Sequence, residues 1–223
     1  MLLSSHVRHH RSLLAAHEKR LLIWMAERLP LWLNPDHLSA LGLLSMVGAG
    51  LSFFYAQWNP GLGLPLVVAF LALNWFGDSL DGTIARVRNQ QRPRYGFYVD
   101  HVIDLAGTAC LFAGLAASGF MSPLVAALVV AGFFLVSAEA FLATHTRGIF
   151  RMAFARIGPT ELRLLLAAGA LALLNGPSVD VPAVGELRLF DLGGVIGAIG
   201  MAAAFVVTSS INVRALYLEE TRR

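Results

Sequence analysis

Long apolar runs separated by short polar connections make up most of the chain from residue 37 onward. A helix needs about 20 mostly apolar residues to cross the roughly 30 Å hydrocarbon core of a bilayer, so runs of this length predict membrane-spanning helices. Six spans are predicted, at about residues 37–57, 61–75 and onward, 97–119, 122–144, 161–174 and 190–213. We therefore expect an all-α integral membrane protein.

A mixed apolar and cationic segment precedes the first run. Residues 13–33 combine Leu, Ile, Trp and Met with Lys, Arg, His and Glu, at spacings that give a helix one apolar and one cationic face. This pattern predicts an amphipathic helix that lies at the membrane interface and is ended or bent by Pro30. A solvated basic tail is the alternative.

Composition and charge support a membrane protein and predict which side of the membrane its connections face. The chain is 57% hydrophobic and only 14% charged, which excludes an ordinary soluble domain. If both termini and the two arginine-rich connections share a side, that side holds every Lys and Arg except Arg188, and such an excess marks the cytoplasm. We expect a multi-pass protein of the cell membrane with membrane lipids, and no nucleic acid, as partners. Its single domain (1–223) would comprise a cytoplasmic juxtamembrane helix at 1–35, a six-helix bundle at 36–214 and a cytoplasmic tail at 215–223.

Four aspartates lie where the second and third predicted spans meet their arginine-rich connection. Asp78 and Asp81 are three residues apart and Asp100 and Asp104 are four apart, so each pair shares one face of its helix. A carboxylate inside a span costs about 2.5 to 3.5 kcal/mol on insertion scales, and such residues usually face a polar cavity. Mg²⁺ prefers carboxylate oxygens and completes its coordination with water and substrate phosphates. The two acidic faces therefore predict a site for Mg²⁺ and a phosphate-bearing substrate.

Small and basic residues around the aspartates fit such a substrate. Gly82 follows the second aspartate and Gly96 opens the third predicted span, so a backbone or a ligand can approach closely at both points. The connection after Arg86 carries further arginines, which bind anionic groups well. For those further arginines, a role in orienting the chain in the membrane is an equal alternative.

These residues together form a recognisable motif. The pattern Asp78-x₂-Asp81-Gly82-x₂-Ala85-Arg86-x₉-Gly96-x₃-Asp100-x₃-Asp104 resembles the signature of the CDP-alcohol phosphotransferases, also called CDP-alcohol phosphatidyltransferases. The six-span layout and the juxtamembrane helix are similar as well. The resemblance implies an enzyme of phospholipid biosynthesis, in which an acceptor hydroxyl attacks a phosphorus of a CDP-linked donor and CMP leaves.

The resemblance also implies roles for the matching positions. Asp78, Asp81 and Asp100 would ligate Mg²⁺, two ions being expected, with Mn²⁺ as a substitute. Asp104 would be a ligand, the general base, or both, which makes Asp100 and Asp104 the catalytic pair. Ser39 follows an Asn-Pro segment similar to the start of the first span in many members, and its alternative role is a helix N-cap or a neutral residue of the span. The implied CDP-binding residues are Ser39, Asp78, Asp81, Gly82, Ala85, Arg86 and Gly96.

The signature does not fix the donor or the acceptor. We expect CDP-diacylglycerol to pass a phosphatidyl group to an alcohol. A CDP-choline or CDP-ethanolamine type of phosphotransferase with a lipid acceptor is the alternative, and the run Gly158-Pro159-Thr160-Glu161 is similar to a segment of such enzymes. The arginines after the fourth span could bind a phosphorylated acceptor. Alternatively, they serve only to orient the chain in the membrane. Phosphatidylglycerophosphate synthases are expected to have a lysine-rich connection between the fourth and fifth spans. Lys19 is the single lysine of this chain, so this type of enzyme is disfavoured. The candidate acceptor-binding residues are Glu139, His145, Arg147, Arg151 and Arg156.

Two other classes of protein fit the sequence less well. A divalent-cation transporter would carry polar residues across the bilayer, but the far halves of the second and third spans hold no charge. A protein that acts only by helix packing would leave the aspartates unexplained. Three glycines of the last span nevertheless predict close helix packing or a homodimer interface: Gly193, Gly197 and Gly200.

Overall fold

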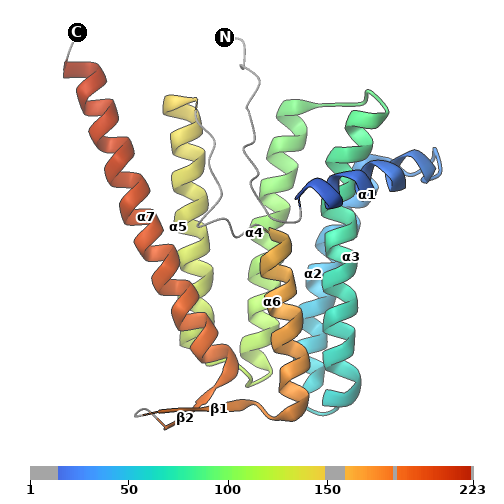
Figure 1. Ribbon diagram of the computed structural model, residues 1–223, viewed down its shortest axis with the longest axis vertical. Helices are drawn as coiled ribbons and strands as arrows, with labels where there is room; N and C mark the ends of the chain where they lie inside the picture. Colours follow the sequence, from blue (N-terminus) through green and yellow to red (C-terminus); the bar gives the residue numbers. More distant parts are fainter. Residues whose placement is uncertain (1–14, 149–158, 183–184, 222–223) are drawn as a thin grey trace.

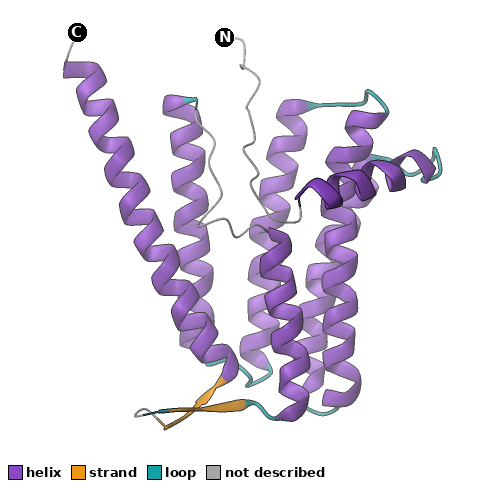
Figure 2. Cartoon of the chain, in the orientation of Figure 1, coloured by secondary structure: helices purple, strands orange, loops and turns teal. Residues whose placement is uncertain are grey.

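A computed structural model describes residues 15–148, 159–182 and 185–221 of the chain. This part forms seven α-helices, one 3₁₀ turn and one β-hairpin (Figures 1 and 2). The elements are α1 (Ala15–Arg28), α2 (Pro35–Ala56), α3 (Pro60–Val87), α4 (Pro93–Ala117), α5 (Pro123–Arg147), α6 (Pro159–Ala172), η1 (Leu173–Asn175), β1 (Ser178–Val181), β2 (Gly185–Arg188) and α7 (Leu189–Thr221). The predicted all-α membrane class is confirmed.

Five of these helices are long and apolar enough to cross a membrane, namely α2, α3, α4, α5 and α7. The predicted fifth span, residues 161–174, corresponds to α6, which has 14 residues and passes into η1. Figure 1 shows α6 running from beneath α1 to the end that carries the hairpin. Residues 149–158, just before α6, lie outside the described part. The predicted count of six spans is therefore not confirmed, because the described part of α6 is shorter than a span requires.

Prolines define where five of the helices begin. Each of α2 to α6 starts with a proline. Backbone N–H groups in the first turn of a helix have no partner within the helix, so a proline, which has no N–H, loses no hydrogen bond there. Its fixed backbone φ also suits a helix. Asparagine side chains complete two of these starts: Asn34 Oδ1 accepts from the His37 N–H at 3.0 Å, and Asn59 Oδ1 accepts from the Leu62 N–H at 3.2 Å. The N-cap of α2 is thus Asn34, so the N-cap role considered for Ser39 is wrong.

Helix α1 lies across the bundle near one end, as the interfacial prediction required (Figure 1). It ends at Arg28, two residues before Pro30. Leu22 and Ala26 are buried in a cluster with Leu80 and Ile84 of α3. Neighbouring side chains on α1 remain exposed, among them Trp24, at 53% of its surface. Part of the apolar face of α1 therefore packs on the protein and part is exposed, and its place at a membrane interface stays a prediction.

Arg88 fastens the segment between α1 and α2. Its guanidinium donates to the backbone oxygens of Leu33 at 2.6 Å, Leu29 at 2.7 Å and Pro30 at 3.1 Å. This arginine belongs to the arginine-rich connection that the sequence assigned either to phosphate binding or to topology. In the structure it holds the α1–α2 link against the end of α3.

Helices α2, α3 and α4 approach one another closely at glycines. A Cβ atom on Gly77 of α3 would lie 2.6 Å from the Leu38 oxygen and 2.8 Å from the Gly42 nitrogen of α2. A Cβ atom on Gly114 of α4 would lie 2.0 Å from the Gly50 oxygen. Real side chains do not tolerate these separations, so glycine is required where the backbones cross. These crossings bring the three helices that carry the predicted aspartates and Ser39 into direct contact.

Helix α7 packs along α5 and is joined to η1 through the hairpin. β1 and β2 pair antiparallel, with Ser178 opposite Arg188. This hairpin was not predicted from the sequence. The packing role predicted for Gly193, Gly197 and Gly200 is not supported within the described residues, because a Cβ at each would meet no atom within 4 Å. A homodimer interface at these glycines stays a prediction.

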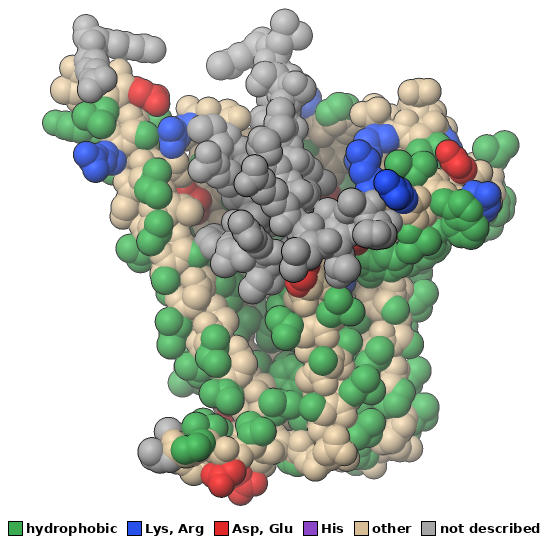
Figure 3. Space-filling model, in the orientation of Figure 1, with side chains coloured by type: hydrophobic (Ala, Val, Ile, Leu, Met, Phe, Trp, Pro, Cys, Tyr) green, Lys and Arg blue, Asp and Glu red, His purple; other side chains and the backbone are tan. Residues whose placement is uncertain are grey.

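The two ends of the bundle differ in charge. The Lys and Arg side chains visible in Figure 3 lie toward the end that carries α1, whereas the hairpin end shows acidic and apolar groups. The 88–92 connection joins α3 and α4 at the α1 end, and the 57–59 connection joins α2 and α3 at the other end. This arrangement agrees with the charge asymmetry of the sequence. The assignment of the α1 end to the cytoplasm stays a prediction.

Candidate active site

The four predicted aspartates line one cavity between α2, α3 and α4. Asp78 and Asp81 face it from α3, and Asp100 and Asp104 face it from α4. The remaining lining residues are Ser39, Gly42, Asn74 and Ile103. The cavity is small: its volume of about 10 Å³ corresponds to about one water-sized sphere. The two acidic helix faces therefore converge on one cavity, as the spacing of the aspartates predicted.

Asp81 is held by α2 and by its own backbone. The Ser39 hydroxyl donates to Asp81 Oδ2 at 2.6 Å and also contacts the Pro35 oxygen at 3.2 Å. The second carboxylate oxygen of Asp81 accepts from the Gly82 N–H at 2.5 Å. Both oxygens of Asp81 thus have donors, which fixes the direction of the carboxylate. Ser39, predicted as a CDP-binding residue, contacts a predicted metal ligand.

Asp78 is paired with an arginine from α6. Arg163 Nη2 lies 2.5 Å from Asp78 Oδ2, and Arg163 Nε donates to Asn74 Oδ1 at 2.7 Å. The Asn74 amide group in turn donates to the Gly42 oxygen at 3.0 Å. This network joins α6, α3 and α2 around the cavity. Arg163 and Asn74 were not predicted as site residues, because Arg163 is one of several arginines after the fourth predicted span.

The two aspartates of α4 have different neighbours. Asp100 Oδ2 lies 3.7 Å from Nδ1 of the buried His101, whose ring packs against Phe97 and Phe141. His101 Nδ1 also lies 2.6 Å from the Phe97 oxygen. Asp104, one helical turn further along α4, faces the same cavity. Asp100 thus borders an aromatic cluster, while Asp104 lies deeper in the bundle.

The donor set of the cavity fits a hard divalent cation. Four carboxylates, one hydroxyl and one amide oxygen surround it, and oxygen ligands of this kind suit Mg²⁺ and Mn²⁺. In the described part of the chain, however, no three His, Cys, Asp or Glu side chains are grouped as a metal-binding set. Asp78 contacts Arg163, and Asp81 contacts Ser39 and Gly82. These carboxylates have to turn before they can share an ion.

The other residues predicted to bind CDP lie at the α1 end of α3 and α4. Arg86 donates to the Thr83 hydroxyl at 3.0 Å, and its guanidinium lies beside Gly82. Gly96 is in the first turn of α4, where a Cβ would meet no described atom within 4 Å. Neither these residues nor Ala85 lines the acidic cavity. Their roles in CDP binding therefore stay predictions.

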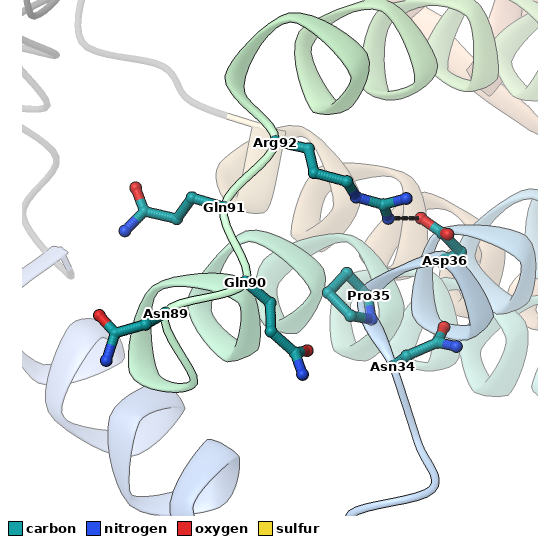
Figure 4. A pocket seen from close by; sticks show the side chains of 7 residues that line it. All are labelled: Asn34, Pro35, Asp36, Asn89, Gln90, Gln91 and Arg92. Atoms are coloured by element: carbon teal, nitrogen blue, oxygen red, sulfur yellow. Dashed lines mark hydrogen bonds and ion pairs between the residues drawn. The ribbon is translucent and has the colours of Figure 1, made fainter.

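A larger cavity lies at the start of α2 (Figure 4). Its volume is about 410 Å³, and it is lined by Asn34, Pro35, Asp36, Asn89, Gln90, Gln91 and Arg92. Arg92 and Asp36 form an ion pair across it, and Gln90 points toward the beginning of α2. Asp36 and Ser39 are three residues apart on α2, so the ion pair lies one helical turn from the contact between Ser39 and Asp81. The two cavities therefore lie along the same face of α2.

The predicted acceptor-binding residues do not line the acidic cavity. Asn212 of α7 links two of them, because its amide nitrogen donates to Glu139 at 2.5 Å and its oxygen accepts from Arg147 at 2.5 Å. This network connects α5 to α7. His145 is exposed on α5. Arg151 and Arg156 lie outside the described residues. An acceptor role for these five residues stays a prediction.

Comparison with protein families identifies a match over most of the chain. The family model described as CDP-alcohol phosphatidyltransferase matches residues 32–210, which is well over half of the chain and includes all four aspartates. No curated protein matches. The matched range begins just before α2 and ends within α7, so it covers both cavities.

Proposed function

Because the chain belongs to the CDP-alcohol phosphatidyltransferase family, we propose that it passes a phosphatidyl group from CDP-diacylglycerol to an alcohol hydroxyl in a Mg²⁺-dependent reaction that releases CMP. Family membership establishes a coarser activity, the transfer of a phosphate-linked alcohol group from a CDP-alcohol donor to an alcohol acceptor. It also agrees with the five apolar helices in describing a multi-pass membrane protein. The metal, the lipid donor and the acceptor are the proposed parts.

The convergence of Asp78, Asp81, Asp100 and Asp104 on one cavity carries this proposal. Four carboxylates this close repel one another unless cations compensate them. When bound there, Mg²⁺ would neutralise the diphosphate and stabilise the charge that develops on departing CMP. We propose that two ions are shared among these aspartates, and that Ser39 orients Asp81 toward them. Mn²⁺ would serve as a substitute.

Asp104 is the best-placed candidate for a general base. It lies one helical turn beyond Asp100, on the part of the cavity furthest from the start of α4. A carboxylate accepts a proton efficiently when it lies within about 2.6–3.2 Å of the acceptor hydroxyl. We propose that Asp104 takes the proton as the hydroxyl attacks, while Asp100 holds the donor's phosphate side in place with the aspartates of α3.

The larger cavity at the start of α2 supports a position for the nucleoside. Its volume of about 410 Å³ lies within the usual range of about 300–1,000 Å³ for small-molecule pockets. Its amide side chains offer both donors and acceptors, which a pyrimidine base requires. We propose that cytidine occupies this cavity and that the diphosphate extends along α2 toward Ser39. Gly82, Ala85, Arg86 and Gly96 would then border the diphosphate.

The position of the acidic cavity supports a lipid-linked donor. The aspartates of α3 lie on a helix that packs against α1, and α1 exposes apolar and basic side chains such as Trp24 and Arg28. Interfacial helices of this kind lie at the depth of lipid headgroups. A CDP group attached to diacylglycerol would lie at the same depth.

Release of CMP from purified protein tests the proposal. The full chain would be placed in lipid nanodiscs with Mg²⁺, a panel of alcohols, and either CDP-diacylglycerol or CDP-choline. We expect CMP release with CDP-diacylglycerol, its loss in Asp81→Asn, and no loss in the control Asp180→Asn, which changes an exposed carboxylate of the hairpin. Release with CDP-choline alone would refute the donor assignment, and full turnover by Asp81→Asn would refute the metal assignment.

A further inference from the structure

Among the described residues, Arg163 is a cation that contacts an aspartate of the acidic cavity. Its side chain is 14% exposed, and that of its partner Asp78 is 24% exposed. The guanidinium uses two different nitrogens, with Nη2 on Asp78 at 2.5 Å and Nε on Asn74 at 2.7 Å. An arginine held by two partners at this depth has a defined position. It therefore acts on the charge of the cavity directly.

Arg163 and a metal ion would compete for the same oxygen. Asp78 Oδ2, which would be a ligand oxygen in the proposed metal site, already accepts from Arg163. The cavity has room for about one water-sized sphere, so a divalent ion at Asp78 would lie close to the guanidinium charge. Like charges at such separations repel strongly where water is scarce. A divalent ion ligated by Asp78 would therefore weaken the contact between Arg163 and this carboxylate.

We propose that Arg163 is a built-in counter-cation, which compensates Asp78 in the metal-free protein and leaves this carboxylate when a divalent ion binds. The proposal rests on the proposed metal site and adds a residue that competes with the metal. The contact turns Asp78 toward α6.

Contacts at the start of α6 allow the guanidinium to move while the helix stays in place. Glu18 of α1 accepts from the Thr160 hydroxyl at 2.9 Å and from Trp75 Nε1 at 2.7 Å. This joint ties the first turn of α6 to α1 and α3, independently of Arg163. The bond from Nε to Asn74 can also persist while Nη2 leaves Asp78. The exchange of Asp78 between Arg163 and an ion then needs only a side-chain rotation.

Removal of Arg163 should strengthen metal binding. If the contact with Asp78 exists only in the metal-free protein, its loss destabilises that state alone, and by linkage the affinity for the ion rises. We expect Arg163→Gln to bind Mn²⁺ at least tenfold more tightly than the wild type, which corresponds to about 1.4 kcal/mol. Arg163→Lys keeps the charge but loses the planar fork, so its affinity should lie between the two.

Mn²⁺ titration of the full chain in nanodiscs, without substrate, measures these affinities. Free Mn²⁺ is followed by its electron paramagnetic resonance signal, and thermal unfolding is recorded with EDTA and with saturating Mn²⁺. Arg147→Gln is a matched control: Arg147 is 18% exposed and also donates to an asparagine, but does not line the cavity. We expect the control to bind Mn²⁺ as the wild type does.

The outcomes separate this proposal from the proposed function. Tighter binding by Arg163→Gln, with a loss of thermal stability in EDTA that Mn²⁺ abolishes, would support the counter-cation. Unchanged or weaker binding by this variant, while the wild type binds Mn²⁺, would overturn the counter-cation and leave the metal site intact. Absence of Mn²⁺ binding in wild type and variants alike would overturn the metal site and the counter-cation with it. Should Arg163→Gln not fold, Arg163→Lys gives the same comparison with a smaller expected change.

Discussion

Gly77→Ala should disturb both the fold and the site, because Gly77 lies where α3 touches α2 beside Asp78. The new methyl group would lie 2.6 Å from the Leu38 oxygen, whereas ordinary contact begins at 3.4 Å, so α2 has to move by the difference of about 0.8 Å. Overpacking of this kind costs about 1–3 kcal/mol. The higher helix propensity of alanine returns up to about 1 kcal/mol. We expect a net loss of up to about 2 kcal/mol in the free energy of unfolding.

The same displacement should lower activity. Ser39 lies one residue from Leu38 and donates to Asp81 at 2.6 Å, so a shift of α2 lengthens this hydrogen bond. Misplacement by about 1 Å costs an enzyme about 100-fold in rate. Unfolding in SDS would measure stability, and CMP release would measure kcat/KM. Gly197→Ala is the control, because its methyl group meets no described atom within 4 Å. A Gly77→Ala protein with wild-type stability and wild-type kcat/KM would refute the close approach of α2 and α3.

Two further predictions follow from single contacts. Ser39→Ala removes the 2.6 Å hydrogen bond to Asp81, and since bonds to charged groups contribute about 1.5–3 kcal/mol, we expect kcat/KM for CMP release to fall about tenfold or more, with recovery in Ser39→Thr. Arg88→Gln removes donors to three backbone oxygens of the α1–α2 link, so amide hydrogen exchange at residues 29–33 should become about tenfold faster; unchanged exchange there would contradict the clamp role of Arg88.

The acidic half of the site was predictable because it depends on local spacing. Residues three and four apart on a helix share a face, so Asp78 with Asp81 and Asp100 with Asp104 had to present paired carboxylates. Carboxylates in apolar helices rarely face lipid, which left a shared cavity as the favoured arrangement. The structure confirms that these four line one cavity.

Arg163 was not predictable in the same way. It lies 85 positions from Asp78 in the chain and comes from a region where several arginines fit the topology rule equally well. Its contact depends on how α6 docks against α3, which involves Glu18, Thr160 and Trp75. Contacts between helices that are far apart in the chain leave no repeating pattern in a single sequence, so this docking could not be predicted.

Two fold predictions that the structure does not confirm have physical explanations as well. The apolar run at residues 161–174 was interpreted as a span, but α6 has 14 residues and its chain turns through η1 into a hairpin. Apolar content alone does not reveal where a short helix ends. Gly193, Gly197 and Gly200 were interpreted as packing residues, yet small residues permit a close approach without specifying a partner.

Iron-mediated cleavage of the backbone tests most directly whether the aspartates of α3 and α4 share a divalent ion. Fe²⁺ would replace Mg²⁺ in the full chain in nanodiscs, and ascorbate with peroxide would generate hydroxyl radicals that cut the backbone next to the bound ion. We predict cuts near residues 78–82 and near residues 100–104 in the same sample, both suppressed by excess Mg²⁺. Cuts confined to one of these helices, or located elsewhere in the chain, would contradict the shared site.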